Sequence, residues 1–149
     1  MPKSPEKSLR NRALDALARR EHSRHELARK LAPYAENTDQ LNDLLDDLQA
    51  RGWLSDARYA AQMVYARQDR YGSRKIAFEL REKGVDESLV NAMLDSLQGT
   101  ELERARAVWQ KKFGQAPASK QEKAKQIRFL QSRGFGWEVI VRVLKLPGD

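Results

Sequence analysis

Apolar residues recur every three or four positions along the chain, with polar residues between them. Near its middle, Leu89, Val90, Met93, Leu94 and Leu97 mark one face of such a pattern. This spacing is that of an amphipathic α-helix, and no stretch alternates residue by residue as a half-buried strand would. The pattern therefore predicts an all-α protein.

Capping residues mark where several of the expected helices begin. Residues 23–26, 100–103 and 119–122 each pair a Ser or Thr with a Glu three positions later. In such a capping box both side chains satisfy free amides of the first turn. Ser4 followed by Pro5 indicates a further helix start near the N-terminus.

Glycine and proline mark where helices are expected to end. Gly52, Gly84 and Gly134 each follow an amphipathic stretch and read as helix C-caps. Pro33 has no amide hydrogen, so it should end the second helix early. Together with the starts, these signals divide the chain into nine expected helices.

The chain also repeats itself. Residues 80–86 align with residues 130–136 at an offset of 50, and a weaker copy upstream aligns Leu31 with Leu80 at an offset of 49. A period of this size indicates stacked supersecondary units, each too small to be stable without its neighbours.

Three units of this length fill the 149 residues. We expect three tandem three-helix repeats at residues 1–54, 55–98 and 99–149, stacked as a solenoid rather than folded around one cleft. The functional question is then what an extended surface binds.

Charge follows the repeat. The chain has 28 Lys and Arg against 21 Asp and Glu, a formal net charge of +7. Residues 1–34, 58–84 and 101–149 carry net charges of +5, +4 and +6, whereas residues 35–57 and 85–100 carry −5 and −3. This balance favours a polyanion or an acidic protein surface as partner, although charge also keeps a helical surface soluble.

The sequence offers little for catalysis or metal binding. It has no cysteine, which excludes disulfides and thiolate-ligated zinc, and no glycine-rich phosphate loop. His22 and His25 are the only histidines, and the expected helix start at Ser23 separates them. We therefore expect no enzyme, no metal and no cofactor.

No apolar run approaches the roughly 18 residues of a membrane-spanning helix. The charged N-terminal residues are not followed by the apolar core of a signal peptide. The expected location is the cytosol.

Two basic clusters are candidate binding residues. In the first, Arg70, Arg74 and Lys75 surround the helix start at residues 71–73, where free amides and cations could grip a phosphate or carboxylate. The second is the densest and suits a phosphate backbone better than base edges. Its members are Lys111, Lys112, Lys120, Lys123, Lys125 and Arg128. For both clusters, ordinary surface charge is the alternative.

Most aromatic residues are interpreted as packing, because they fall on apolar stripes. These residues are Trp53, Trp109, Phe113, Phe129 and Trp137. Tyr59, Tyr65 and Tyr71 are ambiguous, since tyrosine can pack its ring while presenting its hydroxyl, and single-strand binders stack bases on such rings.

Three blocks resemble the RecX regulatory proteins. They are residues 19–27, residues 56–85 with Tyr71-Gly72-Ser73-Arg74-Lys75, and residues 128–144 with Arg133-Gly134-Phe135. The match keeps the order of the blocks and covers nearly the whole chain. Around Pro33 the usual Lys-Gly-aromatic turn is missing, so the first turn departs from the pattern.

The resemblance implies a cytoplasmic bacterial modulator of the RecA recombinase, with three tandem three-helix repeats forming an elongated, curved molecule. Family members bind in the groove of the RecA–single-strand DNA filament and restrain its growth. RecA's ATP hydrolysis, strand exchange and coprotease activity fall as a result, and some members also bind DNA directly. We expect a monomer whose partner is the RecA filament, with single-strand DNA as a further partner.

On these grounds we expect a central partner-binding block made of Arg58, Tyr59, Arg67, Tyr71, Arg74 and Lys75. Weaker candidates, for nucleic acid, are Arg70, Lys120, Lys123, Arg128 and Arg133. Several of them could instead be salt-bridge partners within the helices. Two alternative functions stay open: a nucleic-acid-binding module that acts without RecA, and a basic helical adaptor for an acidic protein.

Overall fold

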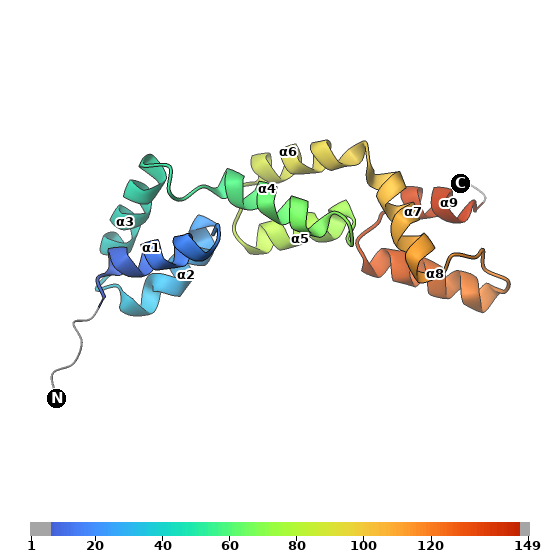
Figure 1. Ribbon diagram of the computed structural model, residues 1–149, viewed down its shortest axis with the longest axis horizontal. Helices are drawn as coiled ribbons and strands as arrows, with labels where there is room; N and C mark the ends of the chain where they lie inside the picture. The colour runs from blue at the N-terminus through green and yellow to red at the C-terminus, as the bar shows by residue number, and fades with distance from the viewer. Residues whose placement is uncertain (1–6, 147–149) are drawn as a thin grey trace, which may run out of the picture. The chain divides into compact units, whose positions relative to one another are not determined.

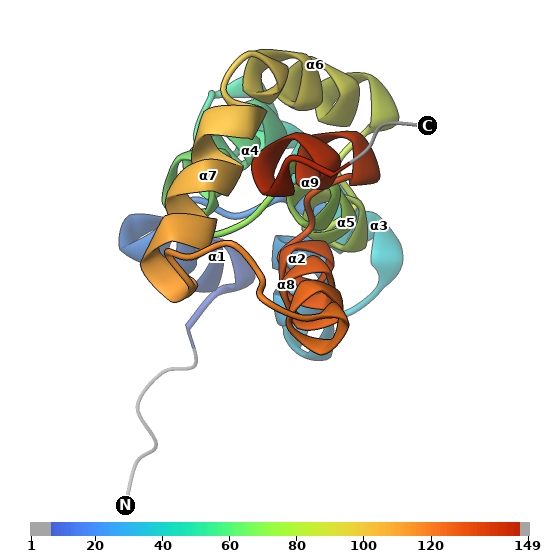
Figure 2. The same ribbon diagram turned by 90° about the vertical axis from the view of Figure 1, so that its right-hand side faces the viewer.

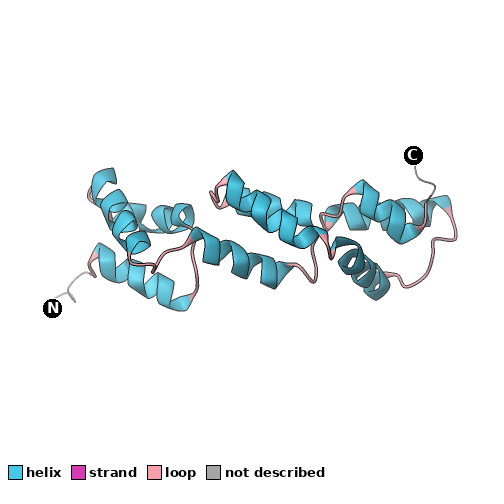
Figure 3. Ribbon diagram, turned by 90° about the horizontal axis from the view of Figure 1, so that it is seen from above, coloured by secondary structure: helices cyan, strands magenta, loops and turns pink. Residues whose placement is uncertain are grey.

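The computed structural model of the protein describes residues 7–146, and every regular element in that range is helical (Figure 3). The predicted all-α fold is confirmed. Nine α-helices and one short 3₁₀ turn make up the described chain. Their bounds are α1 Leu9–Arg19, α2 Arg24–Leu31, η1 Ala32–Tyr34, α3 Thr38–Ala50, α4 Asp56–Arg67, α5 Ser73–Glu82, α6 Glu87–Gln98, α7 Glu101–Lys112, α8 Lys120–Ser132 and α9 Trp137–Leu144.

The helices form two compact units. Unit 1 holds the residues up to Gln62 together with Lys83–Val85, and unit 2 holds Met63–Glu82 and the residues from Asp86 onward. Among residues 7–146, no helix is long and apolar enough to cross a membrane.

Unit 1 is built on the packing of α2 against α1 and α3 (Figure 1). Leu27 and Leu31 of α2 and Leu45 and Leu48 of α3 are all at most 2% exposed. They belong to one apolar cluster with Ala13 of α1. Burying each leucine contributes about 1.5–3 kcal/mol, so this seam accounts for much of the unit's stability.

Unit 2 contains two seams, one between α5 and α6 and one in which α9 packs on both α7 and α8 (Figure 2). The second seam buries Ala105, Leu130, Phe135, Ile140 and Val143. Four of them, Leu130, Phe135, Ile140 and Val143, align at the offset of 50 with the apolar residues Leu80, Val85, Val90 and Met93, so the repeat in the sequence is largely a repeat of buried faces.

The capping box at Ser23 is confirmed. Its hydroxyl accepts the Glu26 amide at 3.1 Å, and the Glu26 carboxylate accepts the Ser23 amide at 3.4 Å. Helix α1 begins at Leu9 behind the cap residue Ser8. The helix start expected at Ser4 lies outside the described residues.

The capping box expected at Thr100 is wrong. The Thr100 hydroxyl donates to the Leu97 carbonyl at 3.2 Å and accepts from Arg104, so it makes no cap hydrogen bond to α7. Glu101, the first residue of α7, binds elsewhere.

The capping box expected at Ser119 forms only in half. The Ser119 hydroxyl accepts the Glu122 amide at 3.1 Å. The Glu122 carboxylate instead accepts the amide of Ala118, one residue earlier than expected.

The expected helix ends are confirmed. Gly52, Gly84 and Gly134 follow α3, α5 and α8 with φ angles of 77°, 74° and 93°. Helix α2 stops at Leu31, and Pro33 lies in the 3₁₀ turn that follows it.

Two of the tryptophans are more exposed than the packing interpretation requires. Trp53 and Trp137 are 45% and 44% exposed. Trp53 follows the end of α3 and lies against the guanidinium groups of Arg10 and Arg51. Trp137 begins α9 and lines a surface groove. Neither of the two is therefore a core residue.

Candidate polyanion-binding site

The site in unit 2 is built on a close backbone contact. The amide of Gly72 donates to the Arg133 carbonyl at 2.6 Å, and the amide of Arg74 donates to the Gly134 carbonyl at 3.1 Å. A Cβ atom at Gly72 would collide with the Gly134 backbone, so only glycine permits this approach. The contact fixes the start of α5 against the end of α8.

A largely buried ion pair also holds the start of α5. The Glu101 carboxylate accepts the amide of Ser73 at 2.7 Å and pairs with Arg104. Arg104 also donates to the carbonyls of Gln68 and Tyr71, at 2.8 and 2.9 Å. The side chains of Glu101 and Arg104 are only 9% and 11% exposed.

These contacts correct one expectation. The start of α5 was predicted to offer free amides to a phosphate or carboxylate. In the structure the amides of Gly72, Ser73 and Arg74 already have protein acceptors, and Glu101 supplies the negative charge that the helix N-terminus favours. A ligand here would have to bind through side chains.

Side chains do gather beside this junction, around two aromatic rings. The guanidinium of Arg133 lies 5.4 Å from the ring centre of Tyr71 and 4.9 Å from that of Phe129. Lys75 and Arg70 lie over the Tyr71 ring at 4.7 and 5.5 Å. Lys112 lies 5.6 Å from the Phe129 ring. We call these six residues the Tyr71 cluster.

The four cations of the Tyr71 cluster have no carboxylate partner among the described residues. The ion pairs in residues 7–146 involve none of Arg70, Lys75, Lys112 and Arg133. Aromatic faces attract them, but only by about 0.5–1 kcal/mol each at exposed sites. The cluster therefore keeps a concentrated positive charge that an anionic partner can neutralise.

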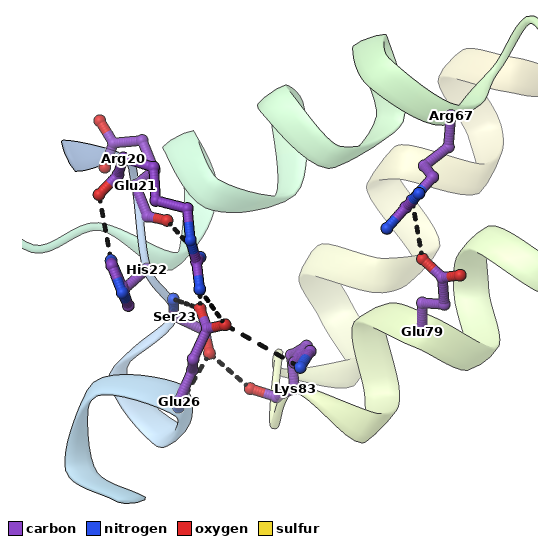
Figure 4. A network of polar contacts seen from close by, with 8 residues as sticks. All are labelled: Arg20, Glu21, His22, Ser23, Glu26, Arg67, Glu79 and Lys83. Carbon is purple, nitrogen blue, oxygen red and sulfur yellow. Dashed lines mark hydrogen bonds and ion pairs between the residues drawn. The ribbon is translucent and has the colours of Figure 1, made fainter. Parts of the chain in front are cut away.

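The other members of the predicted central block lie in different settings. Arg58 pairs with Glu21 at 2.8 Å. Figure 4 shows the second pair, in which Arg67 binds Glu79 at 3.1 Å. Tyr59 is only 7% exposed, so its ring packs in the interior and presents little surface to a partner. Of the predicted six, Tyr71 and Lys75 are the ones that the structure brings into the cluster.

Arg74 points to a neighbouring groove. The groove holds about 610 Å³ and is lined by Arg74, Trp137 and Arg142 together with the carboxylates of Asp95 and Glu138. Arg74 takes part in no ion pair among the described residues, so it remains available to a partner. The groove itself has mixed charge.

The weaker candidates on α8 are also available. Lys120 and Arg128 are exposed and Lys123 is half-buried. The ion pairs of the described chain include none of the three, and the one acidic residue of α8, Glu122, binds a backbone amide. Arg70 and Arg133 are the two nucleic-acid candidates that belong to the Tyr71 cluster.

Unit 1 treats its cations differently, because most of them are neutralised internally. Asp47 accepts from both Arg10 and Arg51, at 2.8 and 2.9 Å, and their guanidinium groups lower the pKa of its carboxyl. Further pairs join Lys7 to Asp15, Arg20 to Glu26 and Arg24 to Asp46.

Glu26 is the centre of one such network (Figure 4). It binds Arg20 at 2.8 Å and lies 3.9 Å from Lys83, and the Arg20 guanidinium helps to lower its pKa although burial opposes the shift. The Ser23 hydroxyl donates to the Lys83 carbonyl at 2.8 Å. The network ties α2 to Lys83, another residue of unit 1.

Sequence reasoning missed three features of the site: the pair of Glu101 and Arg104, and the contributions of Lys112 and Phe129 to the Tyr71 cluster. The sequence pattern predicts Lys112 in the second basic cluster and Phe129 among the packing aromatic residues. The sequence signal for the Glu101–Arg104 pair was an acid and an arginine three positions apart at a helix start, a spacing typical of a side-chain pair.

Comparisons with known proteins agree with this architecture. The second three-helix domain of RecX matches residues 55–94, and the third matches residues 100–144. The Regulatory protein RecX of Leptothrix cholodnii is 53% identical over 142 residues, covering 95% of this chain and 90% of that protein. The protein of the same name from Chromobacterium violaceum is 46% identical, covering 96% and 93%.

The fold is shared with solved structures. The crystal structure of RecX from Lactobacillus salivarius superposes with a TM-score of 0.79 at 20% identity, covering 93% of this chain and 96% of that one. Fold and comparisons thus define a regulatory protein built from three-helix domains. The chain belongs to the RecX family.

Proposed function

We propose that the protein regulates the RecA recombinase by binding in the groove of the RecA–single-strand DNA filament. Bound there, it restrains filament extension and lowers RecA's ATPase, strand exchange and coprotease activity. Membership of a family of regulatory proteins supports the class of function. The observation that carries the proposal is the Tyr71 cluster, where four cations without carboxylate partners gather on two aromatic rings.

A filament groove presents DNA phosphates and protein side chains together. Guanidinium and ammonium groups bind phosphates and carboxylates alike, and arginine also stacks on planar groups. In this proposal Tyr71, Arg74 and Lys75 contact the partner, while Arg70 and Arg133 contact nucleic acid beside them. Lys120, Lys123 and Arg128 extend the nucleic-acid contact along α8.

The paired arginines have a different role in this proposal. Arg58 and Arg67 hold α4 through Glu21 and Glu79 and shape the surface rather than bind the partner. Three repeats, bounded at residues 1–54, 55–98 and 99–149, act as one monomeric cytoplasmic protein. In this proposal the chain catalyses no reaction of its own. It restrains the filament, and RecA's own ATP hydrolysis falls as a result.

The test is RecA's single-strand-DNA-dependent ATP hydrolysis, titrated with the protein below the RecA concentration. Wild-type protein should lower it steeply. Arg133→Glu and Arg74→Glu should each weaken inhibition by roughly tenfold or more, because charge reversal turns an attractive contact repulsive. Arg81→Glu serves as control, since Arg81 is exposed in the same unit but already bound to Glu87 at 2.7 Å.

The proposal fails if wild-type protein leaves RecA hydrolysis unchanged. If inhibition is present but both reversals keep full potency, the Tyr71 cluster and Arg74 are not the contact surface. Circular dichroism spectra should match for all variants, so that a loss of potency reports contact rather than unfolding.

A second candidate function is favoured by the unpaired cations of α8. A nucleic-acid-binding module that acts without RecA would bind naked DNA tightly and with a strong salt dependence. Salt-dependent DNA binding together with unchanged RecA hydrolysis would select this function.

A further inference from the structure

The first repeat differs from the others at the end of its second helix. At the offsets that align the repeats, Tyr34 stands where the later repeats have Lys83 and Arg133. Pro33 replaces the glycine-ended helix by the 3₁₀ turn Ala32–Tyr34. Tyr34 in this turn is 55% exposed.

An arginine stacks on this ring. The guanidinium carbon of Arg12, on α1, lies 3.7 Å from the Tyr34 ring centre, the closest approach of a cation to a ring among the described residues. The two residues line a pocket of about 220 Å³. Exposed rings and guanidinium planes are the surfaces on which unpaired nucleic-acid bases stack.

The pocket is positively charged. It is also lined by Lys7, Asp15, Arg19 and Lys30. Lys7 binds Asp15 at 2.7 Å, and Lys7 and Arg19 lower the pKa of that carboxyl. Arg12, Arg19 and Lys30 take part in no ion pair among residues 7–146, so the pocket carries uncompensated cations beside an exposed ring.

A second exposed aromatic residue of unit 1, Trp53, differs from Tyr34 in that its neighbouring cations are already paired. Trp53 also lies against two guanidinium groups, those of Arg10 and Arg51, at 5.8 and 5.3 Å. Both arginines are already bound to Asp47. Trp53 therefore has the aromatic and cationic groups without the free charge, which makes it a matched internal control.

We infer that the Tyr34 pocket binds single-stranded nucleic acid directly. An unpaired base stacks on Tyr34 and Arg12, and the neighbouring phosphates bind Arg19 and Lys30. A duplex keeps its bases inside, so it cannot present one to the ring, and the carboxylates of an acidic peptide would bind the cations of the pocket without needing the ring. The inference goes beyond the proposed function, because this contact lies in unit 1, whereas the contacts of the proposed function all come from unit 2.

The experiment measures the fluorescence anisotropy of labelled oligo(dT) and of an abasic oligomer of equal length, without RecA. Tyr34→Ala should weaken oligo(dT) binding at least about fivefold, the lower range for losing one stacked base, and leave abasic binding unchanged. Lys30→Gln should weaken the binding of both oligomers. It should also reduce the slope of log affinity against log salt concentration by about 0.7, because one phosphate contact is lost. Tyr34→Phe should keep wild-type affinity.

Trp53→Ala is the matched control and should leave both affinities unchanged. Equal losses on oligo(dT) and the abasic oligomer for Tyr34→Ala would overturn the stacking contact, as would an equal loss for Trp53→Ala. Weaker binding of labelled poly-glutamate by Tyr34→Ala and Lys30→Gln, with unchanged binding of oligo(dT), would overturn the inference and assign the pocket to an acidic protein. Since RecA is absent, failure here leaves the filament proposal standing, and the ATPase titration tests that proposal separately.

Discussion

His22 is a buried side chain with an incomplete set of hydrogen bonds. It is 1% exposed, and its Nδ1 lies 3.0 Å from the Arg20 carbonyl, so Nδ1–H donates there. Nε2 is then a buried acceptor without a partner in the described chain. Burial lowers the pKa of His22, and the charges of Arg20 and Lys30 add to this, whereas the Arg20 carbonyl and Glu26 oppose it.

This histidine predicts a pH-dependent stability. Its pKa in the folded state lies below the value of about 6.5 for an unfolded chain, so the unfolded chain takes up the proton first. The free energy of unfolding should therefore fall as pH drops below about 6.5 and should not respond to this group above it. Carboxyls with lowered pKa, such as those of Asp47 and Glu87, titrate well below this window.

Urea unfolding at about pH 7.5 and about pH 5.5 checks the prediction. His22→Gln should remove most of the fall between the two pH values, whatever its effect on stability at the higher one. The exposed His25, changed to Gln, is the control and should keep the fall. An undiminished pH response in His22→Gln would show that other groups cause it.

Gly84 gives a second prediction at this scale. Its φ of +74° strains any other residue, and a Cβ there would lie 2.5 Å from the Cβ of His25. Gly84→Ala should therefore lower the free energy of unfolding by at least about 1–3 kcal/mol. Gly99→Ala is the matched control, because a Cβ at Gly99 meets nothing within 4 Å. Thermal unfolding of the two variants should differ accordingly, and equal midpoints would contradict the prediction.

At the scale of elements, one capping contact occurs twice. Asp56, at the start of α4, accepts the amide of Arg24 at 2.7 Å, and Glu101, at the start of α7, accepts the amide of Ser73 at 2.7 Å. In each case a carboxylate from the first helix of one repeat caps the second helix of the repeat before. The caps thus link successive repeats as well as satisfying helix starts.

These two caps could not be predicted from the sequence. Helix type and most helix ends could be predicted, because apolar period, glycine and Ser23-type caps act over a few residues. The contact of Asp56 with Arg24 spans 32 residues, and that of Glu101 with Ser73 spans 28. Nothing local distinguishes an acid that caps a distant helix from one that caps its own.

In the candidate site, too, some contacts could be predicted from the sequence and others could not. Arg70, Tyr71 and Lys75 are neighbours in sequence, so their grouping could be predicted. Arg133 reaches them only because the Gly72 backbone meets the end of α8. The predicted Arg58 and the cluster cations look alike in sequence, and a carboxylate distant in the chain decides which of them is neutralised.

The Glu101 cap predicts that Glu101 and Arg104 are strongly coupled in their contributions to the free energy of unfolding. Glu101→Ala should cost about 3 kcal/mol or more, because it leaves Arg104 buried without its partner and the Ser73 amide without its acceptor. The double variant Glu101→Ala/Arg104→Ala should cost less than the sum of the two single variants. Urea unfolding measures all three, with Glu103→Ala, exposed on the same turn, expected within about 0.5 kcal/mol of wild type. Additive single losses would show that the pair is not coupled.

At the scale of the whole molecule, the two units differ in how many of their cations are paired with carboxylates. Unit 1 pairs most of its cations with carboxylates of its own, and those pairs are partly exposed and contribute little stability each. Unit 2 leaves the cations of α8 and of the Tyr71 cluster unpaired. Unpaired like charges lower the stability of a folded surface slightly, so folding alone does not account for their arrangement.

This asymmetry predicts that removing charge from α8 separates binding from stability. The triple variant Lys120→Gln/Lys123→Gln/Arg128→Gln should fold with wild-type stability or slightly more, since it breaks no ion pair and relieves repulsion. Its inhibition of RecA should weaken, and the slope of log potency against log salt should decrease by about 2 if all three contact single-strand phosphates. Arg81→Gln, which removes a charge that Glu87 already neutralises, should leave that slope unchanged. A triple variant with the wild-type salt slope would mean that α8 faces solvent in the bound state, and the charge of unit 2 would then act through the Tyr71 cluster alone.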